Sequence, residues 1–547
     1  MTTLGIGAIT HDSGAAITEK GKIIHAVNEE RFNRIKLSGG FPHLSMKYLL
    51  EKVKKENIDK IAVSDLGDTE FRKRSASLMT DPGLFSDNPY ISAKSWLIML
   101  RWKTRTQMMF KQQQQELRKR LGNKLIQVEH HEVHAASTYM CSGLKKVLII
   151  TCDNHGDFLT TTASIGHGSS LERIHAVKWP HSPGFFYAIV TKALGFKQWR
   201  HEGKITGLAA FGNPNAPFYE TIKKLMWYEN GTIKTSALLG SRGIVHRLAQ
   251  KYSREDLAAV FQRVFEEVIC DYTKYYMDKT GIKDIALAGG AFANVKLNER
   301  IKELGAKSVF VFPHMGDGGT AAGAALFVDM QEGALPYKLK DVYFGPSWNS
   351  KEIKQEIDKR NVSAQYHEDI ESQVAELLAK GKVVARWNGA MEFGPRALGN
   401  RSILYQATDP SVNDWLNKRL KRTEFMPFAP VTLEQYAPKC YKNLKGAEYT
   451  AKFMTICFEA TPYLKETCPA VVHVDNTARP QLITKSDNPS YYKILDEYRK
   501  ITKLPSIVNT SFNMHEEPIV CSPEDAIRSF KQGHLNYLAM GDFLVKK

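Results

Sequence analysis

The sequence lacks paired cysteines, long apolar runs and an excess of acidic residues, and each absence excludes a class of protein. Its seven cysteines are scattered over 547 residues without a CxxC pair, which argues against a disulfide framework, a zinc ribbon or a cluster-binding domain. No apolar run approaches the roughly 18 residues of a membrane-spanning helix, and the first residues do not resemble a secretory signal. We therefore expect a protein of the reducing cytoplasm that has no membrane partner.

The composition is that of a globular enzyme with an uneven positive charge. Hydrophobic residues make up 43% of the chain and charged residues 24%, and the formal net charge is +17. Residues 94–124 carry nine basic side chains and one acidic side chain, together with Trp96, Trp102 and Phe110. We expect this segment to be mostly helical. Such a mixture suits the binding of phosphates and bases, although a solvated basic helix with buried aromatic residues would look the same.

Strand patterns that recur along the first 330 residues predict an α/β domain with a repeated, sheet-centred core. We expect a hairpin in the first 35 residues, with strands at LGIGAIT and GKIIHAV and a turn at HDSGAA. Residues 284–301 and 308–328 each predict a strand, a Gly-rich turn and a helix. Pro and Gly punctuate residues 333–349, where we place a domain boundary. Beyond it we expect an amphipathic helix near 351–380, strands at KVVARW and PSIVNTSF, and a helix around 523–533.

The sharpest metal signal is HHEVH at residues 130–134. On a helix, His130 and His134 lie one turn apart on the same face and can share an ion, although two packed or solvated histidines would give the same pattern. Asp153 and Asp317 both follow apolar strands, where side chains emerge at the edge of a sheet. Two His and two Asp ligands suit iron, manganese or zinc better than magnesium or calcium.

Glycine loops and arginine loops are candidates for binding phosphate. Gly289–Gly290 and Gly318–Gly319 each precede a predicted helix, which favours an anion site, although glycines also mark plain turns. The sequence contains no Walker, GxSxG or early GxGxxG motif. The second domain offers basic and polar side chains in four loops, which suit bidentate recognition of phosphate or carboxylate: Arg396, Arg401, Lys421, Arg422, Arg479, Ser511 and Asn513.

Taken together, these stretches resemble the NodU/CmcH-type O-carbamoyltransferases over essentially the whole chain. The matching segments are THDSGAAITEKGKIIHAVNEERFNRIK, HHEVHAAS, HEGKITGLAAFG, LAGGAFANVKLN, GDGGTAAGAA, MEFGPRALGNRS, TARPQ, NTSFN and EEPIVCSPEDAI. The resemblance implies an N-terminal ASKHA-type (actin/hexokinase-like) α/β domain over residues 1–340. It also implies a C-terminal YrdC-like α/β domain over residues 341–547.

The resemblance implies a two-step reaction. The YrdC-like domain makes carbamoyl adenylate from carbamoyl phosphate and ATP, which carries magnesium. The metal-containing ASKHA domain then transfers the carbamoyl group to an acceptor hydroxyl. His130, His134, Asp153 and Asp317 resemble the metal ligands, with iron the leading candidate and manganese or zinc the alternatives. His11 and Lys36 resemble transfer-site residues, where an imidazole can act as base and an ammonium can steady phosphate charge, although His11 also fits a structural turn.

The remaining site residues follow from the matched stretches. Those expected around the adenylate are Glu202, Lys204, Gly289, Gly290, Asn294 and Gly318. Those expected at ATP and carbamoyl phosphate are Arg396, Arg401, Lys421, Arg422, Arg479, Ser511 and Asn513. Three residues depart from the family pattern: Glu516 and Asn476 stand where glycine is usual, and Ala210 stands where proline is usual. Glu516 adds a carboxylate near the expected anion pocket.

The acceptor is the open part of the prediction. A basic protein attracts nucleotides or DNA and repels a polycation, so the leading candidate is a 5-hydroxymethyl pyrimidine in DNA or a nucleotide. The alternatives are the hydroxyl of a small sugar or antibiotic, a threonylcarbamoyl-tRNA-type synthase, and a non-catalytic nucleic-acid-binding protein of the same fold. The GPRALGNRS loop argues against the synthase, and the retained ligands argue against the non-catalytic protein. A homodimer is left open.

Overall fold

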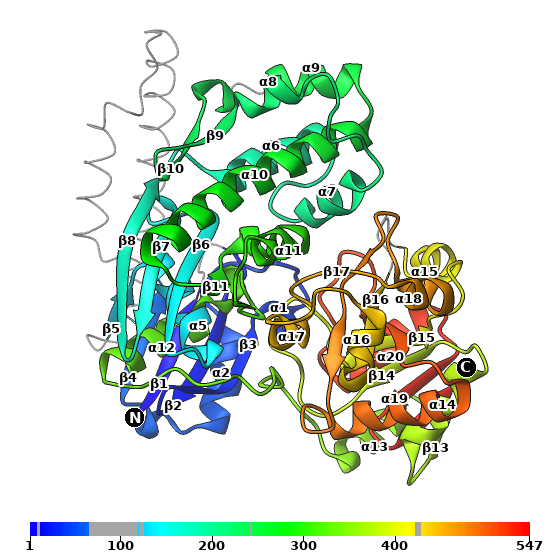
Figure 1. Cartoon of the computed structure of the whole chain (residues 1–547). Coiled ribbons are helices and arrows are strands. Elements are labelled where there is room, and N and C mark those ends of the chain that lie inside the picture. The colour runs from blue at the N-terminus through cyan, green and yellow to red at the C-terminus, as the bar shows by residue number, and fades with distance from the viewer. Residues whose placement is uncertain (8–10, 65–118, 120–124, 241–242, 422–427) are drawn as a thin grey trace. The chain divides into compact units, whose positions relative to one another are not determined.

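The computed structural model describes residues 1–7, 11–64, 119, 125–240, 243–421 and 428–547, in two compact units (Figure 1). Unit 1 comprises Met1–Ile24 and Gly39–Lys338, and unit 2 comprises His25–Ser38 and Leu339–Lys547. A short piece of the N-terminal sequence therefore belongs to the unit that is otherwise C-terminal. The basic segment 94–124 lies outside the described residues except for Lys119, so its helix and its binding role stay predictions.

Unit 1 contains two five-stranded sheets with the same connectivity. The first has the order β3 (Lys22–Asn28), β2 (Gly14–Glu19), β1 (Thr2–Gly7), β4 (Lys60–Ser64) and β5 (Leu125–Val128). The second has the order β8 (Ser170–Lys178), β7 (Leu159–His167), β6 (Lys146–Gly156), β11 (Asp284–Ala288) and β12 (Ser308–Val311). In the first sheet, β1 pairs antiparallel with β2 and parallel with β4. In the second sheet, β6 likewise pairs antiparallel with β7 and parallel with β11. This duplicated α/β architecture is the ASKHA-type fold that the resemblance implied.

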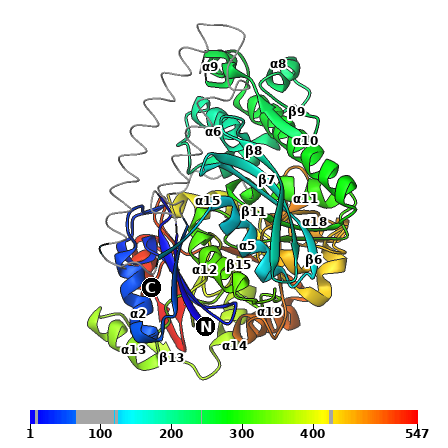
Figure 2. The same ribbon diagram turned by 90° about the vertical axis from the view of Figure 1, so that its left-hand side faces the viewer.

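Two helices lie side by side between the sheets (Figures 1 and 2). Helix α12 (Thr320–Gln331) packs on β1, and α5 (His130–Ser142) packs on β6 and β11. Their close approach explains the small residues of α12: a Cβ added at Gly323 would lie 2.4 Å from the Val133 carbonyl oxygen. Because α5 fills the space between the sheets, its first turn lies near the ends of β6 and β12.

A group of helices in unit 1 packs beside the second sheet. The long helix α10 (Arg254–Thr280) packs against α6 (Pro183–Ala193), α7 (Glu202–Ala209) and α11 (Val295–Glu303). The remaining elements are α2 (His43–Lys52), η1 (Lys55–Asn57), α8 (Tyr219–Lys223), β9 (Met226–Glu229), β10 (Thr232–Thr235), η3 (Ala237–Gly240), α9 (Gly243–Lys251), η4 (Gly290–Ala293) and η5 (Asp317–Gly319).

The strand–turn–helix predictions for unit 1 are confirmed, and the N-terminal hairpin needs a correction. Residues 284–301 form β11, η4 and α11, and residues 308–328 form β12, η5 and α12. The predicted turn HDSGAA runs into a strand of its own, β2, which pairs with β1 over its full length. The sequence hid this strand because its small residues, Gly14, Ala15 and Ala16, look like loop yet pack in the core.

Unit 2 is built on one eight-stranded mixed sheet that is covered on both faces. The strand order is β13 (Ala364–Tyr366), β22 (Phe543–Lys546), β21 (Tyr537–Met540), β14 (Val384–Trp387), β15 (Arg401–Gln406), β20 (Ser506–Ser511), β16 (Ala429–Leu433) and β19 (Gln481–Ile483). Alternate residues enter two separate apolar clusters: Val384 and Leu404 join one, and Ala385 and Ile403 join the other. Because side chains alternate across a strand, both faces of this sheet are buried.

The helices of unit 2 complete the two clusters. Helices α14 (Ile370–Ala379) and α19 (Pro489–Thr502) pack together on one face, and α13 (Ser350–Lys359) and α20 (Pro523–Gln532) belong to the other. The single helix predicted near 351–380 is in fact α13 and α14, which β13 separates. The other elements are α1 (Glu30–Asn33), α15 (Val412–Arg419), η6 (Glu434–Tyr436), α16 (Ala437–Cys440), α17 (Glu448–Ala451), β17 (Phe458–Glu459), α18 (Pro462–Thr467), η7 (Pro469–Val471) and β18 (Thr477–Ala478).

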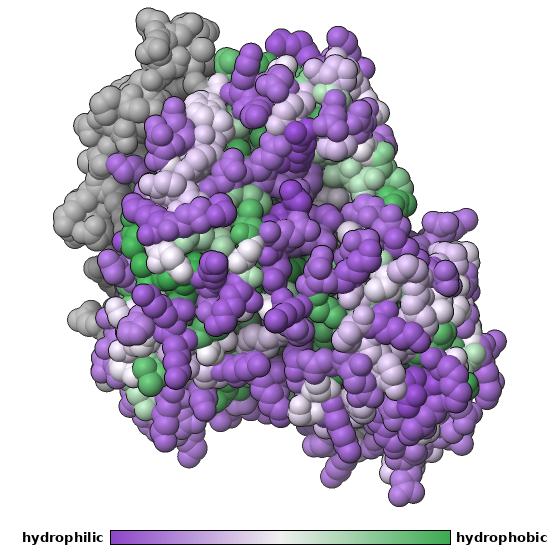
Figure 3. Space-filling view, viewed as in Figure 1, coloured by the Kyte–Doolittle hydropathy of each residue, from purple (hydrophilic) through white to green (hydrophobic). Residues whose placement is uncertain are grey.

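Polar residues dominate the face shown in Figure 3, where hydrophobic residues form only small separate areas on the described surface. Among the described helices, none combines the length and the apolar character that crossing a bilayer requires. Most of the large apolar side chains that the structure describes lie instead in the clusters around the sheets.

Candidate functional site

Four side chains from three parts of unit 1 converge on one point. His130 and His134 lie on the first two turns of α5, Asp153 lies on β6, and Asp317 begins η5, after the short loop that follows β12. The two His Nε2 atoms are 3.1 Å apart. His134 Nε2 lies 3.3 Å from Asp153 Oδ2 and 3.4 Å from Asp317 Oδ1, and the matching distances from His130 Nε2 are 3.8 and 3.6 Å. The structure therefore brings together all four residues that the sequence singled out.

The spacing of these four atoms fits a divalent metal. With metal–ligand bonds of about 2.0–2.2 Å, neighbouring ligand atoms in tetrahedral or octahedral shells lie roughly 2.8–3.6 Å apart. The four ligand atoms all lie within 4.8 Å of one another, and the buried Asp317 Oδ1 accepts no hydrogen bond from the described residues. Mixed imidazole and carboxylate ligands suit iron, manganese or zinc.

The electrostatics of the cluster also favour a cation. Burial lowers the pKa of His130, but the carboxylates of Asp317 and Asp153 outweigh it and raise that pKa to about 10. Burial raises the pKa of Asp153, but its two histidine partners hold it well below the usual value. Without a metal, imidazolium protons thus balance the buried carboxylates. A divalent cation can replace those protons, because metal ligation uses the same lone pairs.

Residues outside the ligand set hold the ligands in place, and of these the sequence had singled out only Gly290. The Asp157 carboxylate accepts a hydrogen bond of 2.8 Å from the His130 backbone N–H and so fixes the start of α5. Backbone N–H groups of Asn154 and Gly290 donate to the two Asp153 oxygens at 2.7 and 3.1 Å. Gly156 is required for contact, since a Cβ there would lie 2.0 Å from the His130 ring. The sequence signal for Asp157 and Gly156 was their position, since they stand together at the end of the strand that carries Asp153.

Neighbouring histidines show that position on α5 decides which imidazole joins the cluster. His131 points away to Thr151, with Nδ1 2.7 Å from its hydroxyl oxygen. Burial lowers the pKa of His131 to about 3, so it is a neutral residue of the interior. His11 lies at the edge of the cluster, with Nε2 3.2 Å from Asp317 Oδ2 and about half of its side chain exposed. The Asp317 carboxylate raises the pKa of His11 to about 9.

The two predicted transfer residues fall in different units. His11 belongs to unit 1, whereas Lys36 lies in the 25–38 segment of unit 2. Lys36 follows α1 in a turn flanked by Arg34 and Leu37, both of which have positive φ angles of 61° and 58°. Non-glycine residues adopt this conformation only where their surroundings determine it. The turn that carries Lys36 is therefore strongly specified.

The residues expected around an adenylate line two helix starts of unit 1. Glu202 begins α7, where its carboxylate accepts from the Trp199 N–H at 2.7 Å, and Lys204 is buried on the same helix. Asn294 caps α11 and exchanges two hydrogen bonds with Gln262 on α10, at 2.9 and 3.1 Å. These contacts make Asn294 a link between α10 and α11.

The glycine loops approach the cluster itself. Gly289 has a φ of 102°, and a Cβ there would lie 2.2 Å from the Cys152 carbonyl oxygen. The N–H of Gly290 is directed at Asp153, and Gly318 is buried beside Asp317 in η5. In the described structure both glycine loops thus contact the four-residue cluster. This role comes in addition to the anion binding that the resemblance implies for them.

Unit 2 holds two arginines without partners among the described residues. Arg396 and Arg479 form no hydrogen bond or ion pair with a described side chain or carbonyl, and the Arg396 Nε is buried. Burial, followed by the positive charge of Arg479, lowers the pKa of Arg396 well below its usual value. Burial also lowers the pKa of Arg479 to about 10. Two half-buried like charges that repel one another form a site that an anion would stabilise.

Arg401 has a different environment although it belongs to the same loop. Its guanidinium donates to four backbone carbonyls, those of Asn388, Gly389, Asn400 and Pro346, at 2.7–3.3 Å. It also stacks 4.2 Å from the centre of the Trp387 ring. Arg401 thus fixes the backbone of the loop that presents Arg396, and only its Nε lacks a hydrogen-bond partner.

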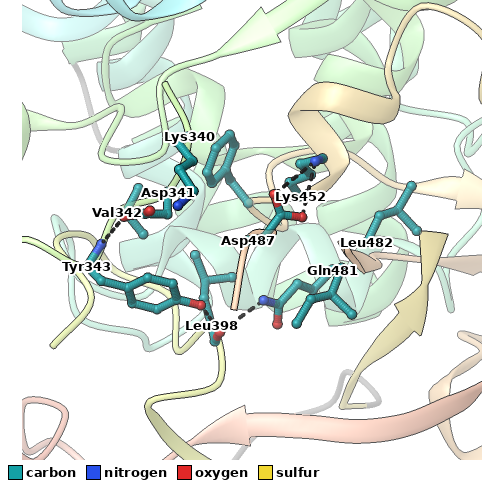
Figure 4. A pocket seen from close by; sticks show the side chains of 11 residues that line it. Lys340, Asp341, Val342, Tyr343, Leu398, Lys452, Gln481, Leu482 and Asp487 are labelled. Atoms are coloured by element: carbon teal, nitrogen blue, oxygen red, sulfur yellow. Dashed lines mark hydrogen bonds and ion pairs between the residues drawn. The ribbon is translucent and has the colours of Figure 1, made fainter. Parts of the chain in front are cut away.

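Other buried polar side chains also fix the 391–401 loop. Glu392 accepts from the backbone N–H groups of Leu398, Asn400 and Arg401 at 2.8–3.1 Å. A small open pocket lies beside the loop, and Figure 4 shows the Tyr343 hydroxyl and the Gln481 amide meeting at the Leu398 carbonyl. A loop held at so many atoms can present Arg396 without reorganisation.

The remaining residues expected in unit 2 are placed as follows. Lys421 is exposed after α15, and Arg422 lies outside the described residues. The Ser511 hydroxyl donates to Asn513 Oδ1 at 2.7 Å, and the Asn513 amide donates to the Met514 and Glu517 carbonyls at 2.9 Å each. Asn513 therefore closes the turn that follows β20.

The comparison with known proteins now decides the family. Residues 2–326 match the model of the carbamoyltransferase N-terminus, and residues 375–547 match that of the carbamoyltransferase C-terminus. The chain belongs to the carbamoyltransferase family. The chain is 31% identical to an uncharacterised protein of Methanocaldococcus jannaschii, covering 100% of this chain and 99% of that protein. It is also 31% identical to the nodulation protein NolNO of Sinorhizobium fredii, covering 98% and 79% of the two chains.

A solved structure of full-length HypF, in a phosphate- and nucleotide-bound form, overlaps with 60% of this carbamoyltransferase at a TM-score of 0.32 and 16% identity, covering 55% of the HypF chain. The family assignment rests on the sequence matches, which extend over both units.

The structure explains two departures of this carbamoyltransferase from the usual family sequence. Glu516 and Asn476, which stand where glycine is usual, have φ angles of 61° and 63°. Glycine is favoured at such positions because it has no Cβ to clash with the neighbouring carbonyl. Asn tolerates the left-handed region better than Glu does, so Glu516 is the more strained of the two.

Replacing Glu516 with glycine is expected to raise the free energy of unfolding of the carbamoyltransferase by about 0.5–1 kcal/mol, because relief of the left-handed strain exceeds the entropy that glycine adds to the unfolded chain. Urea unfolding monitored by fluorescence measures this change. Asn476→Gly is the matched control and should give a smaller gain. A lower stability of the Glu516→Gly protein would mean that the carboxylate, whose Oε1 lies 3.8 Å from His515 Nε2, outweighs the backbone strain.

Proposed function

We propose that the protein is a metal-dependent O-carbamoyltransferase that makes carbamoyl adenylate and transfers its carbamoyl group to an acceptor hydroxyl. The observation that carries this proposal is the convergence of His130, His134, Asp153 and Asp317 at spacings that fit a divalent metal. Membership of the carbamoyltransferase family identifies the transferred group as carbamoyl. The cluster provides a site where a bound metal would act as a Lewis acid.

The first step is assigned to unit 2, for which we propose the YrdC-like role. Carbamoyl phosphate, magnesium–ATP and one water would give carbamoyl adenylate, phosphate and pyrophosphate. This step handles several phosphate groups and needs fixed positive charge. Arg396 and Arg479 supply it, because both are half-buried and neither is neutralised by a described residue. Arg401 and Glu392 keep the loop rigid during the reaction.

The second step is assigned to unit 1. The acceptor oxygen forms a bond to the carbamoyl carbon, the bond from that carbon to the AMP oxygen breaks, and AMP leaves with its electron pair. His130, His134, Asp153 and Asp317 would hold a divalent metal, which would supply Lewis-acid stabilisation of the developing negative charge. The acceptor proton needs a base. The half-exposed imidazole of His11 lies beside Asp317 at the edge of the cluster, and it would be free to act as that base when a bound cation neutralises the carboxylate that otherwise raises its pKa to about 9.

The acceptor that we propose is anionic, with the hydroxymethyl group of a modified pyrimidine in DNA or a nucleotide as the leading candidate. The support comes from charge: the chain carries a net +17, and residues 94–124 contribute nine basic side chains against one acidic side chain. A positive protein concentrates anionic substrates near its surface. The aromatic residues within that segment would suit base stacking.

Incubation of the metal-loaded protein with ATP, carbamoyl phosphate and a panel of acceptors tests this proposal. We expect a mass gain of one carbamoyl unit on hydroxymethylated DNA or nucleotides, with a rate that falls as salt rises. The matched controls are unmodified DNA and neutral sugars. Modification of a sugar alone, independent of salt, would reassign the acceptor. Failure of every acceptor to react, while AMP still forms, would contradict the transferase assignment for this panel.

A further inference from the structure

The segment 25–38 leaves unit 1 at β3 and becomes part of unit 2. Within unit 2 it forms α1 and the Lys36 turn. The Asn33 amide donates to the Ser38 hydroxyl at 2.8 Å, and its carbonyl oxygen accepts from the Ile35 N–H at 2.9 Å. Together with the positive φ angles of Arg34 and Leu37, these bonds mean that the turn has one conformation set by its contacts.

A continuous series of polar contacts connects this turn to the Arg396 loop inside unit 2. The Leu37 N–H donates to Glu30 Oε2 at 2.8 Å, and Glu30 Oε1 lies 3.2 Å from Arg31 Nη1. Arg31 Nη2 then donates to the Gly394 carbonyl at 2.8 Å. Glu30 and Arg31 are both buried, where hydrogen bonds from charged groups are strong.

The hydrogen bond from Arg31 is made to a residue with an unusual backbone conformation. Gly394 has a φ of 144°, a conformation that is essentially restricted to glycine. It lies two residues before Arg396. Apolar packing follows the same path, since Phe32 from α1 contacts the buried cluster that contains Met391 and Ala397. The backbone just before Arg396 is thus held by the segment that also carries Lys36.

We propose that Arg31 is a positioning residue that couples the Arg396–Arg479 anion site to the Lys36 turn, so that phosphate bound at the anion site further stabilises the turn against local opening. The inference rests on the proposed function, which gives carbamoyl phosphate to the first site, and on the transfer role that the resemblance implies for Lys36. Coupling of this kind is reciprocal. The Lys36 turn would therefore be more stable when carbamoyl phosphate occupies the anion site.

Hydrogen exchange of the full-length protein tests the coupling directly. Inorganic phosphate, or carbamoyl phosphate with ATP, should slow amide exchange in residues 391–401 and in residues 29–38 of the wild type. In Arg31→Leu the response of residues 29–38 should disappear. The KM for carbamoyl phosphate in ATP–pyrophosphate exchange should rise on the order of ten- to a hundredfold, with a smaller change in kcat.

Two further variants separate positioning from folding. Arg31→Lys retains one charged donor and should recover part of the coupling. Arg34→Leu is the matched control on the same segment, since Arg34 donates to the Pro518 and Ile519 carbonyls at 2.6 and 2.9 Å and lies 3.3 Å from Asp525. This control should lower the Tm and leave the ligand response of residues 29–38 in place.

The outcomes separate this inference from the proposed function. Unchanged protection of residues 29–38 in Arg31→Leu, or its absence in the wild type with both probes, overturns the coupling. If Arg31→Leu does not fold, Arg31→Lys decides the question. The coupling is overturned if Arg31→Lys loses as much stability as Arg34→Leu yet keeps the full wild-type exchange response of residues 29–38 and the wild-type KM. Phosphate-dependent protection of both segments in a wild type that lacks ATP–pyrophosphate exchange supports the coupling and overturns the proposed function.

Discussion

Replacing His134 with alanine is expected to abolish stoichiometric metal binding and to lower carbamoyl transfer about a thousandfold, since a Lewis acid contributes several kcal/mol to the transition state. His134 Nε2 lies within 3.4 Å of three other ligand atoms, so its loss opens one side of the cluster. Carbamoyl-adenylate formation should persist, because its proposed residues lie in unit 2. Metal content after loading with iron, manganese or zinc, measured beside transfer and ATP–pyrophosphate exchange, checks each part.

The neighbouring histidine provides the matched control for this experiment. His131→Gln also removes a buried imidazole from the first turn of α5, but His131 contacts Thr151 and lies outside the cluster. It should lower stability and leave metal content at the wild-type level. Asp317→Ala should behave like His134→Ala. Full metal occupancy and transfer in both ligand variants would refute the ligand set.

The cluster could be predicted from the sequence because its rules are local. An i,i+4 pair of histidines shares a face of any helix, and Asp153 and Asp317 come near the carboxyl ends of two parallel strands, β6 and β12. The pairing of β6 with β11 and of β11 with β12 places those strand ends at one edge of the sheet. Periodicity therefore sufficed to nominate the residues, although it could not supply their distances.

The supporting contacts could not be predicted, because they depend on the conformation of individual loops. Arg396 and Arg401 stand five residues apart in one motif and looked equivalent as phosphate contacts. In the structure, Arg401 is committed to backbone carbonyls, whereas Arg396 has no described partner. The transfer of residues 25–38 to unit 2 was equally hidden, since no feature of composition separates Arg31 or Arg34 from ordinary surface arginines.

Two unneutralised arginines imply a cost in stability that the anion removes on binding. A buried charge without a partner destabilises a fold, and Arg479 adds repulsion to the desolvation of Arg396. Proteins keep such arrangements where function requires them, and their replacement often stabilises the fold while activity is lost. The same reasoning separates Arg396 from Arg401, whose hydrogen bonds offset its burial.

Arg396→Met is therefore expected to raise the free energy of unfolding by about 1 kcal/mol, and to lower carbamoyl-phosphate-dependent ATP–pyrophosphate exchange about a hundred- to a thousandfold. Inorganic phosphate should raise the Tm of the wild type by mass action and leave that of the variant unchanged. Arg401→Met is the control. Its free energy of unfolding should fall by roughly 3 kcal/mol, because the substitution leaves buried carbonyls without their charged donor. A destabilised Arg396→Met protein that retains both exchange activity and the response to phosphate would show that Arg396 supports the loop and does not hold the anion.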